Sequence, residues 1–136
     1  AQPILFNNLL MGCNIGIASK DYSTPLVVNN TIINNNFGIS GYVKKPIFGG
    51  SDTTVINSII WNNKKNIELD SESKISISSS IIHGGYEGKK NSNEDPRFDS
   101  SFKIVADHAM NKEINKEIYL RLGKDFPISQ VAGYLP

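Results

Sequence analysis

The chain alternates short apolar runs with stretches rich in Asn and Ser, and four of its segments share this pattern. Each segment holds apolar residues on both sides of an Asn or Ser pair, and the four cover residues 4–12, 26–34, 54–62 and 75–84. When equivalent positions are taken at Asn7, Asn29, Asn57 and Ser78, the segments are offset by 22, 28 and 21 residues. A unit of roughly twenty residues, with one longer turn in the second unit, therefore recurs four times.

One such unit cannot bury its own apolar side, but stacked units can, because each strand then pairs in parallel with the equivalent strand of the next unit. The alignment predicts a turn ladder whose side chains hydrogen-bond along the axis: Asn7, Asn29, Asn57 and Ser78. It also predicts two apolar ladders: Phe6, Val28, Ile56 and Ile77, and, inside the coil, Leu10, Ile32, Ile60 and Ile81. The pattern therefore predicts an all-β parallel β-helix, a solenoid of about four coils. Two other folds explain the pattern poorly. A β-sandwich does not need equivalent residues at equivalent positions of each segment, and the regular leucines of a leucine-rich repeat are missing.

The composition favours strands over helices. Asn, Ser and Ile dominate, and Asn with β-branched Ile suits short strands joined by tight turns. Fourteen basic and 13 acidic residues give a net charge of +1, so no strong field would draw the protein to nucleic acid or an acidic membrane. No apolar run is long enough to span a bilayer. The single cysteine, Cys13, excludes an intrachain disulfide and is expected to be a small buried apolar group.

Several stretches resemble a known family. The segments NNTIINNNFGI and INSIIWNN are similar to the right-handed parallel β-helix repeats of the pectate-lyase-like superfamily. IASKDYST and YVKKPIFGG resemble β-helix domains of large bacterial surface proteins, and SSSIIHGGYEG followed by NEDPRF resembles the closing coil of such domains. The resemblance covers residues 4–102 and implies a right-handed β-helix in an extracellular or cell-surface bacterial protein. It says little about function, because this superfamily holds lyases, hydrolases, epimerases, adhesins and inert stalks.

The two ends of the chain differ. Ile4 already occupies a strand position and no polar cap precedes it, so we expect upstream coils or another protein chain to cover the open N-terminal edge. After Ile104 the apolar period becomes helical, with residues four apart at Met110, Ile114, Ile118 and Leu122. Two parts are therefore predicted: β-helix coils at 1–104, and a capping helix with a tail that packs outside the coils at 105–136.

One turn, at residues 40–53, is longer than the others, and functional residues of a repeat scaffold lie where turns lengthen. Tyr42 and Phe48 could stack on sugar rings, while Lys44 and Lys45 could meet uronate carboxylates. We therefore predict substrate-binding residues here. The structural alternative is that Phe48 folds back on the coil and the following Gly pair only turns the chain.

Lys20 and Asp21 lie in the matching turn of the first coil, so we add them to the predicted substrate-binding residues. With Tyr22, they are expected to adjoin the long turn in space. No catalytic set is evident: related lyases use a basic residue and often calcium, and related hydrolases use a pair of carboxylates. The acidic residues at 68–72 lie in a Ser-rich turn that is typical of solvated surface.

No cofactor or metal site is predicted. His83 aligns with Asn34 and Asn62 in a turn ladder, and His108 is far from it in sequence, so zinc would lack ligands. The stretch NEDP could supply some oxygens to calcium, but an Asp-Pro step is typical of a turn, so calcium lacks a supporting ligand set.

A clean repeat without a catalytic set favours a non-catalytic module of a secreted or cell-surface protein, which binds polysaccharide or acts as a scaffold. Two alternatives stay open. The chain could be the C-terminal portion of a polysaccharide lyase or glycoside hydrolase whose catalytic coils lie upstream. It could also be a subunit that docks on another chain through its open coil edge.

Overall fold

The computed structural model describes residues 1–100 and Gly133, and within them the protein is all-β, with no helix. The strands are β1 (Ile4–Phe6), β2 (Leu9–Met11), β3 (Ile15–Ser19), β4 (Leu26–Val28), β5 (Thr31–Ile33), β6 (Phe37–Gly41), β7 (Asp52–Ile56), β8 (Ile59–Trp61), β9 (Lys65–Leu69), β10 (Lys74–Ser78) and β11 (Ile81–Ile82). The predicted helix at 105–136 lies outside the described residues.

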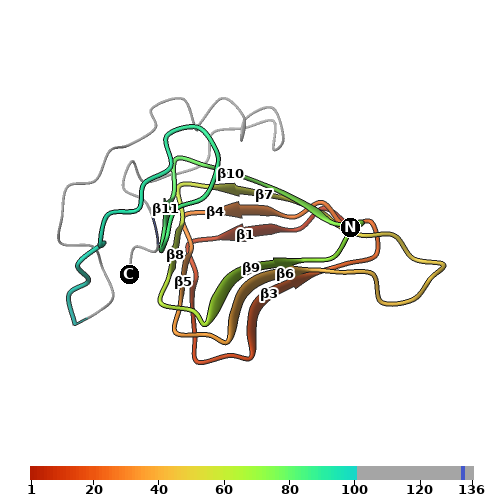
Figure 1. Cartoon of the computed structure of the whole chain (residues 1–136), viewed down its shortest axis with the longest axis horizontal. Coiled ribbons are helices and arrows are strands. Elements are labelled where there is room, and N and C mark those ends of the chain that lie inside the picture. The colour runs from red at the N-terminus through yellow and green to blue at the C-terminus, as the bar shows by residue number, and fades with distance from the viewer. Residues whose placement is uncertain (101–132, 134–136) are drawn as a thin grey trace.

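The strands form three parallel sheets, through which the chain passes in turn. Sheet A has the order β1-β4-β7-β10, sheet B the order β11-β8-β5-β2, and sheet C the order β3-β6-β9. After each pass through A, B and C the chain returns to sheet A beside the strand it left, and sheets A and C lie opposite each other with sheet B at one end (Figure 1). This arrangement is compatible with a parallel β-helix.

The predicted turn ladder is confirmed at three residues and wrong at the fourth. Asn7, Asn29 and Asn57 all have left-handed backbone, with φ of 57°, 54° and 52°, and Asn57 Nδ2 donates to Asn29 Oδ1 at 3.0 Å. The fourth member is Ser79, with φ of 49°, because Ser78 still pairs within the β7–β10 ladder. Asn tolerates this left-handed conformation better than most residues, which explains its repetition at this corner.

The apolar ladders need the same correction of one residue in the fourth segment. The observed ladders are Leu10, Ile32, Ile60 and Ile82, and Phe6, Val28, Ile56 and Ser78. Ile81 and Ile77, which were predicted for the last positions, each lie one residue earlier in the chain. The serine run at 78–80 fits both the predicted and the observed alignment. Side chains of a strand alternate between its two faces, so the predicted alignment, shifted by one residue, would turn Ile77 and Ile82 out of the interior.

Inward-facing aliphatic side chains of the three sheets form one core. Its buried members are Ile17, Val27, Ile32, Ile39, Val55, Ile60, Ile77 and Ile82, against which Leu5, Leu10 and Ile67 are partly buried. Each fully buried aliphatic side chain contributes about 1.5–3 kcal/mol relative to an exposed one. Because equivalent residues stack directly above one another, each pass covers the apolar side of the pass before it.

A polar ladder accompanies the core at the corner between sheets A and B. Four of its backbone N–H groups each donate to the side-chain oxygen of the next member, at distances of 2.9–3.2 Å, and the last acceptor lies in the segment after β11. Its members are Asn8, Asn30, Ser58, Ser80 and Asn91. Buried backbone N–H groups need a hydrogen-bond acceptor, and at this corner, where the strands end, the side chains of the ladder provide one.

Cys13 is exposed, so the prediction of a buried thiol is wrong. It lies at the corner between sheets B and C, where its N–H donates to Asn35 Oδ1 at 2.9 Å. Asn35, one pass later, is buried because it has a neighbouring pass on both sides, and it bonds onward to Asn63. Cys13 belongs to the first pass and has a described neighbour on one side only.

The segment that follows β11 covers the last pass. Ser79 N–H donates to Lys89 O and Ile82 N–H to Ser92 O, both at 2.9 Å, and Tyr86 packs against the core. Burial, with a smaller effect of the neighbouring Glu87 carboxylate, raises the pKa of the Tyr86 phenol. This return segment takes the place of a further strand at the edge of sheets A and B.

Gly133 lies against the outside of sheet B. Its N–H donates to Asn57 O at 2.8 Å, and it contacts the outward-facing Thr31 and Ile59. Gly133 therefore meets the outside of sheet B, and the rest of the predicted tail lies outside the described residues. Among residues 1–100 and Gly133, no helix is long and apolar enough to cross a membrane.

Candidate functional site

Three turns that connect sheet C to sheet A stack at one corner of the molecule. They are residues 20–25, 42–51 and 70–73. Backbone pairing continues into these turns: Asp52 N–H donates to Ser23 O at 3.0 Å, and Lys74 N–H donates to Ser51 O at 2.7 Å. The long second turn projects from this end of the molecule, away from β11 (Figure 1). The strand ladders therefore hold the three turns in register.

Tyr22, a residue of the first turn, packs against the long turn. Lys20 to Ser23 form a turn closed by the Ser23 N–H to Lys20 O bond at 3.0 Å, and its central residues Asp21 and Tyr22 have φ of 55° and 58°. Positive φ at both central residues is the pattern of a type I′ turn. Tyr22 N–H donates to Gly50 O at 2.9 Å, and a Cβ at Gly49 would lie 2.0 Å from Tyr22 Cε1. Only glycine at 49 lets the tyrosine ring come so close to the turn.

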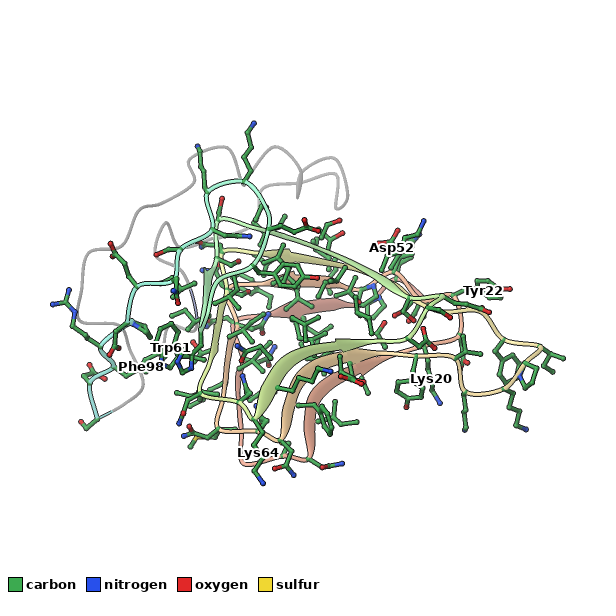
Figure 2. The ribbon with its side chains drawn as sticks, in the orientation of Figure 1. Lys20, Tyr22, Asp52, Trp61, Lys64 and Phe98 are labelled. Carbon is green, nitrogen blue, oxygen red and sulfur yellow. The ribbon has the colours of Figure 1, made fainter. Side chains whose placement is uncertain are left out.

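Beside this ring is a shallow depression of about 290 Å³, which we call the corner groove. It is lined by Tyr22, Thr24, Gly49, Gly50, Ser51, Asp52, Glu72 and Lys74. The Tyr22 side of the groove is open to solvent, since that residue is 73% exposed. Tyr22 and Asp52 lie at the same end of the molecule (Figure 2). The volume is near the lower limit for small-molecule sites, about 300 Å³.

The groove carries two carboxylates and one ammonium group, on Asp52, Glu72 and Lys74. Asp52 and Lys74 are direct partners in the β7–β10 ladder, so their opposite charges lie on neighbouring strands. All three residues are exposed. The arrangement is an aromatic ring beside charged and hydrogen-bonding groups on an open surface.

Asp70 anchors the long turn beside the groove. Its Oδ2 accepts the Val43 N–H at 2.6 Å and its Oδ1 accepts the Glu72 N–H at 3.1 Å. The Val43 N–H is the main reason that the pKa of Asp70 lies below its ordinary value, with smaller contributions from Ser73 and Glu72. This carboxylate therefore joins the start of the long turn to the third turn.

None of the six predicted binding residues lines the groove, although all of them lie in the first and second of the three turns. Tyr42 and Phe48 are half-buried, with their N–H groups donating to Ser19 O at 3.1 Å and Lys45 O at 2.8 Å. Lys44 and Lys45 are exposed on the long turn. Lys20 and Asp21 lie in the adjoining first turn, as expected, and form an ion pair at 3.8 Å.

The groove residues that sequence reasoning missed follow the same offsets as the strands. Tyr22, Gly50 and Glu72 are separated by 28 and 22 residues, as are Thr24, Asp52 and Lys74. Extending the repeat alignment into the turns would have placed these residues side by side. The Ser-rich turn that was assigned to solvated surface supplies both Glu72 of the groove and the Asp70 anchor.

His83 does not join a turn ladder, so that prediction is wrong. Its ring stacks on Trp61, with centroids 4.3 Å apart and an interplanar angle of 14°. The residue level with Asn62 is Gly84, which has φ of 83°. Trp61 and Phe98 pack on the outside of sheet B, at the opposite end from Tyr22 (Figure 2).

Two further observations bear on chemistry. Within residues 1–100, no three His, Cys, Asp or Glu side chains gather into a group that could hold a metal ion. Comparison of the chain with family models, with curated proteins and with solved structures finds no match.

Proposed function

We propose that this protein is a non-catalytic module of a secreted or cell-surface bacterial protein and that it binds polysaccharide at the corner groove. The observation that carries the proposal is the exposed Tyr22 ring beside Gly49, with charged and hydrogen-bonding groups within one depression. An aromatic ring with one open side offers a flat apolar surface to a sugar ring. Neighbouring polar groups can then fix the orientation of the sugar.

The proposal includes a finer description of the fold. We place the chain among right-handed parallel β-helices of the pectate-lyase-like kind, with about four coils and a capping helix at 105–136. The parallel order of all three sheets and the repeated left-handed Asn corners support the solenoid. The resemblance of the repeat segments supports the family, and the helical period after Ile104 supports the cap.

Binding is favoured over hydrolysis by the exposure of the two groove carboxylates. A glycosidase needs one carboxyl group as a general acid, and burial in an apolar environment usually keeps that group protonated. Asp52 and Glu72 are both open to solvent, and Asp52 is the register partner of Lys74 in the β7–β10 ladder. The competing proposal, a C-terminal portion of a lyase or hydrolase, therefore places the chemistry in coils outside this chain.

A second candidate function is docking through the first pass. β1, β2 and β3 are the edge strands of their sheets, and Ile4 and Met11 are exposed there at 37% and 40%. An uncovered edge of this kind is a template for further parallel strands. A further coil, from the same chain or another, would extend all three sheets.

The binding proposal is tested by comparing two tyrosines. The purified protein is applied to a panel of acidic, neutral and amino polysaccharides in size-exclusion and affinity-electrophoresis measurements. Tyr22→Ala should weaken binding about tenfold, since an aromatic contact and its buried area contribute about 1–1.5 kcal/mol. The control Tyr42→Ala, which removes a half-buried ring of the same turn cluster, should leave affinity unchanged. Equal losses in both variants would contradict the groove, and shortening of the polymer by the wild type would contradict a non-catalytic module.

A further inference from the structure

We propose that the corner groove selects glycans with positively charged amino groups, such as glucosamine polymers, over polyuronates. This rests on the proposed function, because it names the ligand class of the same groove. It departs from the expectation that Lys44 and Lys45 of the long turn meet uronate carboxylates.

The charges that line the groove point to a cationic ligand. Asp52 and Lys74 are register partners on β7 and β10, and among the described residues none of the three charged groove side chains, Asp52, Glu72 and Lys74, forms an ion pair within 4.0 Å. The groove therefore has a net charge of −1 from its lining side chains. Asp70 adds a second negative charge next to it, since its carboxylate accepts the Glu72 N–H at 3.1 Å.

The nearby lysines do not offset this charge within the groove. Lys20 already forms an ion pair with Asp21 at 3.8 Å. Lys44 and Lys45 are exposed on the long turn and are not among the groove-lining residues. A uronate chain that stacked on Tyr22 would place its carboxylates near Glu72, and like charges this close are unfavourable.

An amino sugar reverses that interaction. With its ring on Tyr22, its ammonium can pair with the free Glu72 carboxylate, while its hydroxyls meet the Asp52 and Lys74 groups. Ion pairs at exposed sites contribute modestly, by 0.2–1 kcal/mol, which corresponds to a preference of up to about fivefold. Part of that preference should disappear as salt screens the pair.

The test uses three hexasaccharides: the glucosamine hexamer, its N-acetylated form and the galacturonate hexamer. The first two share one backbone and differ in charge at nitrogen, so the ratio of their affinities isolates the electrostatic effect. Titration calorimetry at low salt and slightly acidic pH should rank the amine first, by about threefold to fivefold over the acetylated form. Glu72→Gln should weaken binding of the glucosamine hexamer more than binding of the acetylated hexamer, so that the ratio of the two affinities falls. The control Lys44→Gln/Lys45→Gln should preserve the ratio.

The outcomes separate this inference from the function beneath it. If the wild type binds both neutral and amino hexamers equally, and Tyr22→Ala weakens both, the groove stands and the charge selection is overturned. Tighter binding of galacturonate that is lost in Lys44→Gln/Lys45→Gln would also overturn the selection. Absence of binding to all three hexamers would overturn the charge selection, and absence of binding to the whole polysaccharide panel would overturn the proposed function as well.

Discussion

Replacement of Asn30 by alanine tests how much the buried polar ladder stabilises the fold. Asn30 is fully buried and its side chain makes four hydrogen bonds. Its Oδ1 accepts from the backbone N–H and the Nδ2 of Asn8, both at 2.9 Å. Its Nδ2 donates to Leu5 O at 2.7 Å and to Val28 O at 3.0 Å, so one amide joins two passes of the chain.

The expected loss follows from these contacts. A hydrogen bond contributes about 0.5–1.5 kcal/mol net, and a buried group left without a partner costs about 1–3 kcal/mol. The groups of Asn8 can recover water because that residue is exposed. Val28 O keeps the Asn7 N–H at 3.2 Å but cannot replace its lost second donor by water, since Val28 is 1% exposed. We therefore expect Asn30→Ala to lower the free energy of unfolding by about 2–4 kcal/mol. Asn30→Ser should lose about half of that, because Ser58 at the equivalent position keeps the bond to its own strand, donating to Ile56 O at 3.0 Å.

Urea unfolding followed by far-ultraviolet circular dichroism gives the free energies, provided that the m-value stays constant. Asn8→Ala is the matched control, since Asn8 belongs to the same ladder but is exposed, and its loss should be below about 1 kcal/mol. If Asn30→Ala and Asn8→Ala agree within about 0.5 kcal/mol, the ladder does not stabilise the fold as argued.

Two other changes probe packing and pH dependence. Gly38→Ala should cost about 2 kcal/mol or more, because the new Cβ would lie 2.5 Å from Asn66 O; Gly12→Ala, with open space but φ of 71°, should cost about 1 kcal/mol. A smaller shift of the melting temperature for Gly38→Ala than for Gly12→Ala would refute this packing argument. Asp70→Asn should destabilise the protein at neutral pH. The pKa of Asp70 is lowered in the folded state, so its carboxylate stabilises the fold at pH values above the unfolded-state pKa, and this stabilisation is lost as pH falls through the folded-state pKa. The difference in stability between the variant and the wild type should therefore shrink on acidification from about pH 5 downwards. A gap that does not vary with pH in denaturant titrations would count against this role of the carboxylate.

The repeat and the sheet class could be predicted from sequence because the corners demand particular residues. Left-handed backbone at equivalent corners selects Asn7, Asn29 and Asn57, so the period is visible in the sequence. The core ladders follow from the alternation of apolar residues on either side of those corners. Both signals are local, and each is repeated in the chain.

The register of the fourth segment and the composition of the groove depended on the tertiary structure. The serine run at 78–80 carries no local signal that distinguishes two alignments one residue apart, and only the pairing of β10 with β7 places Ile77 inside. The sequence predicts aromatic binding residues in the long turn, at Tyr42 and Phe48, but the aromatic ring that lines the groove is Tyr22, from the turn one pass earlier.

The groove joins residues from three passes. Neither Tyr22 nor Glu72 has a local sequence context that marks it as a binding residue, and each gains its setting from backbone pairing between successive turns. Sequence alone determined the period and the polarity of each face, because these depend on the preferences of single residues. The tertiary structure decided which turns lie side by side, because that depends on hydrogen bonds between residues 23 to 29 positions apart.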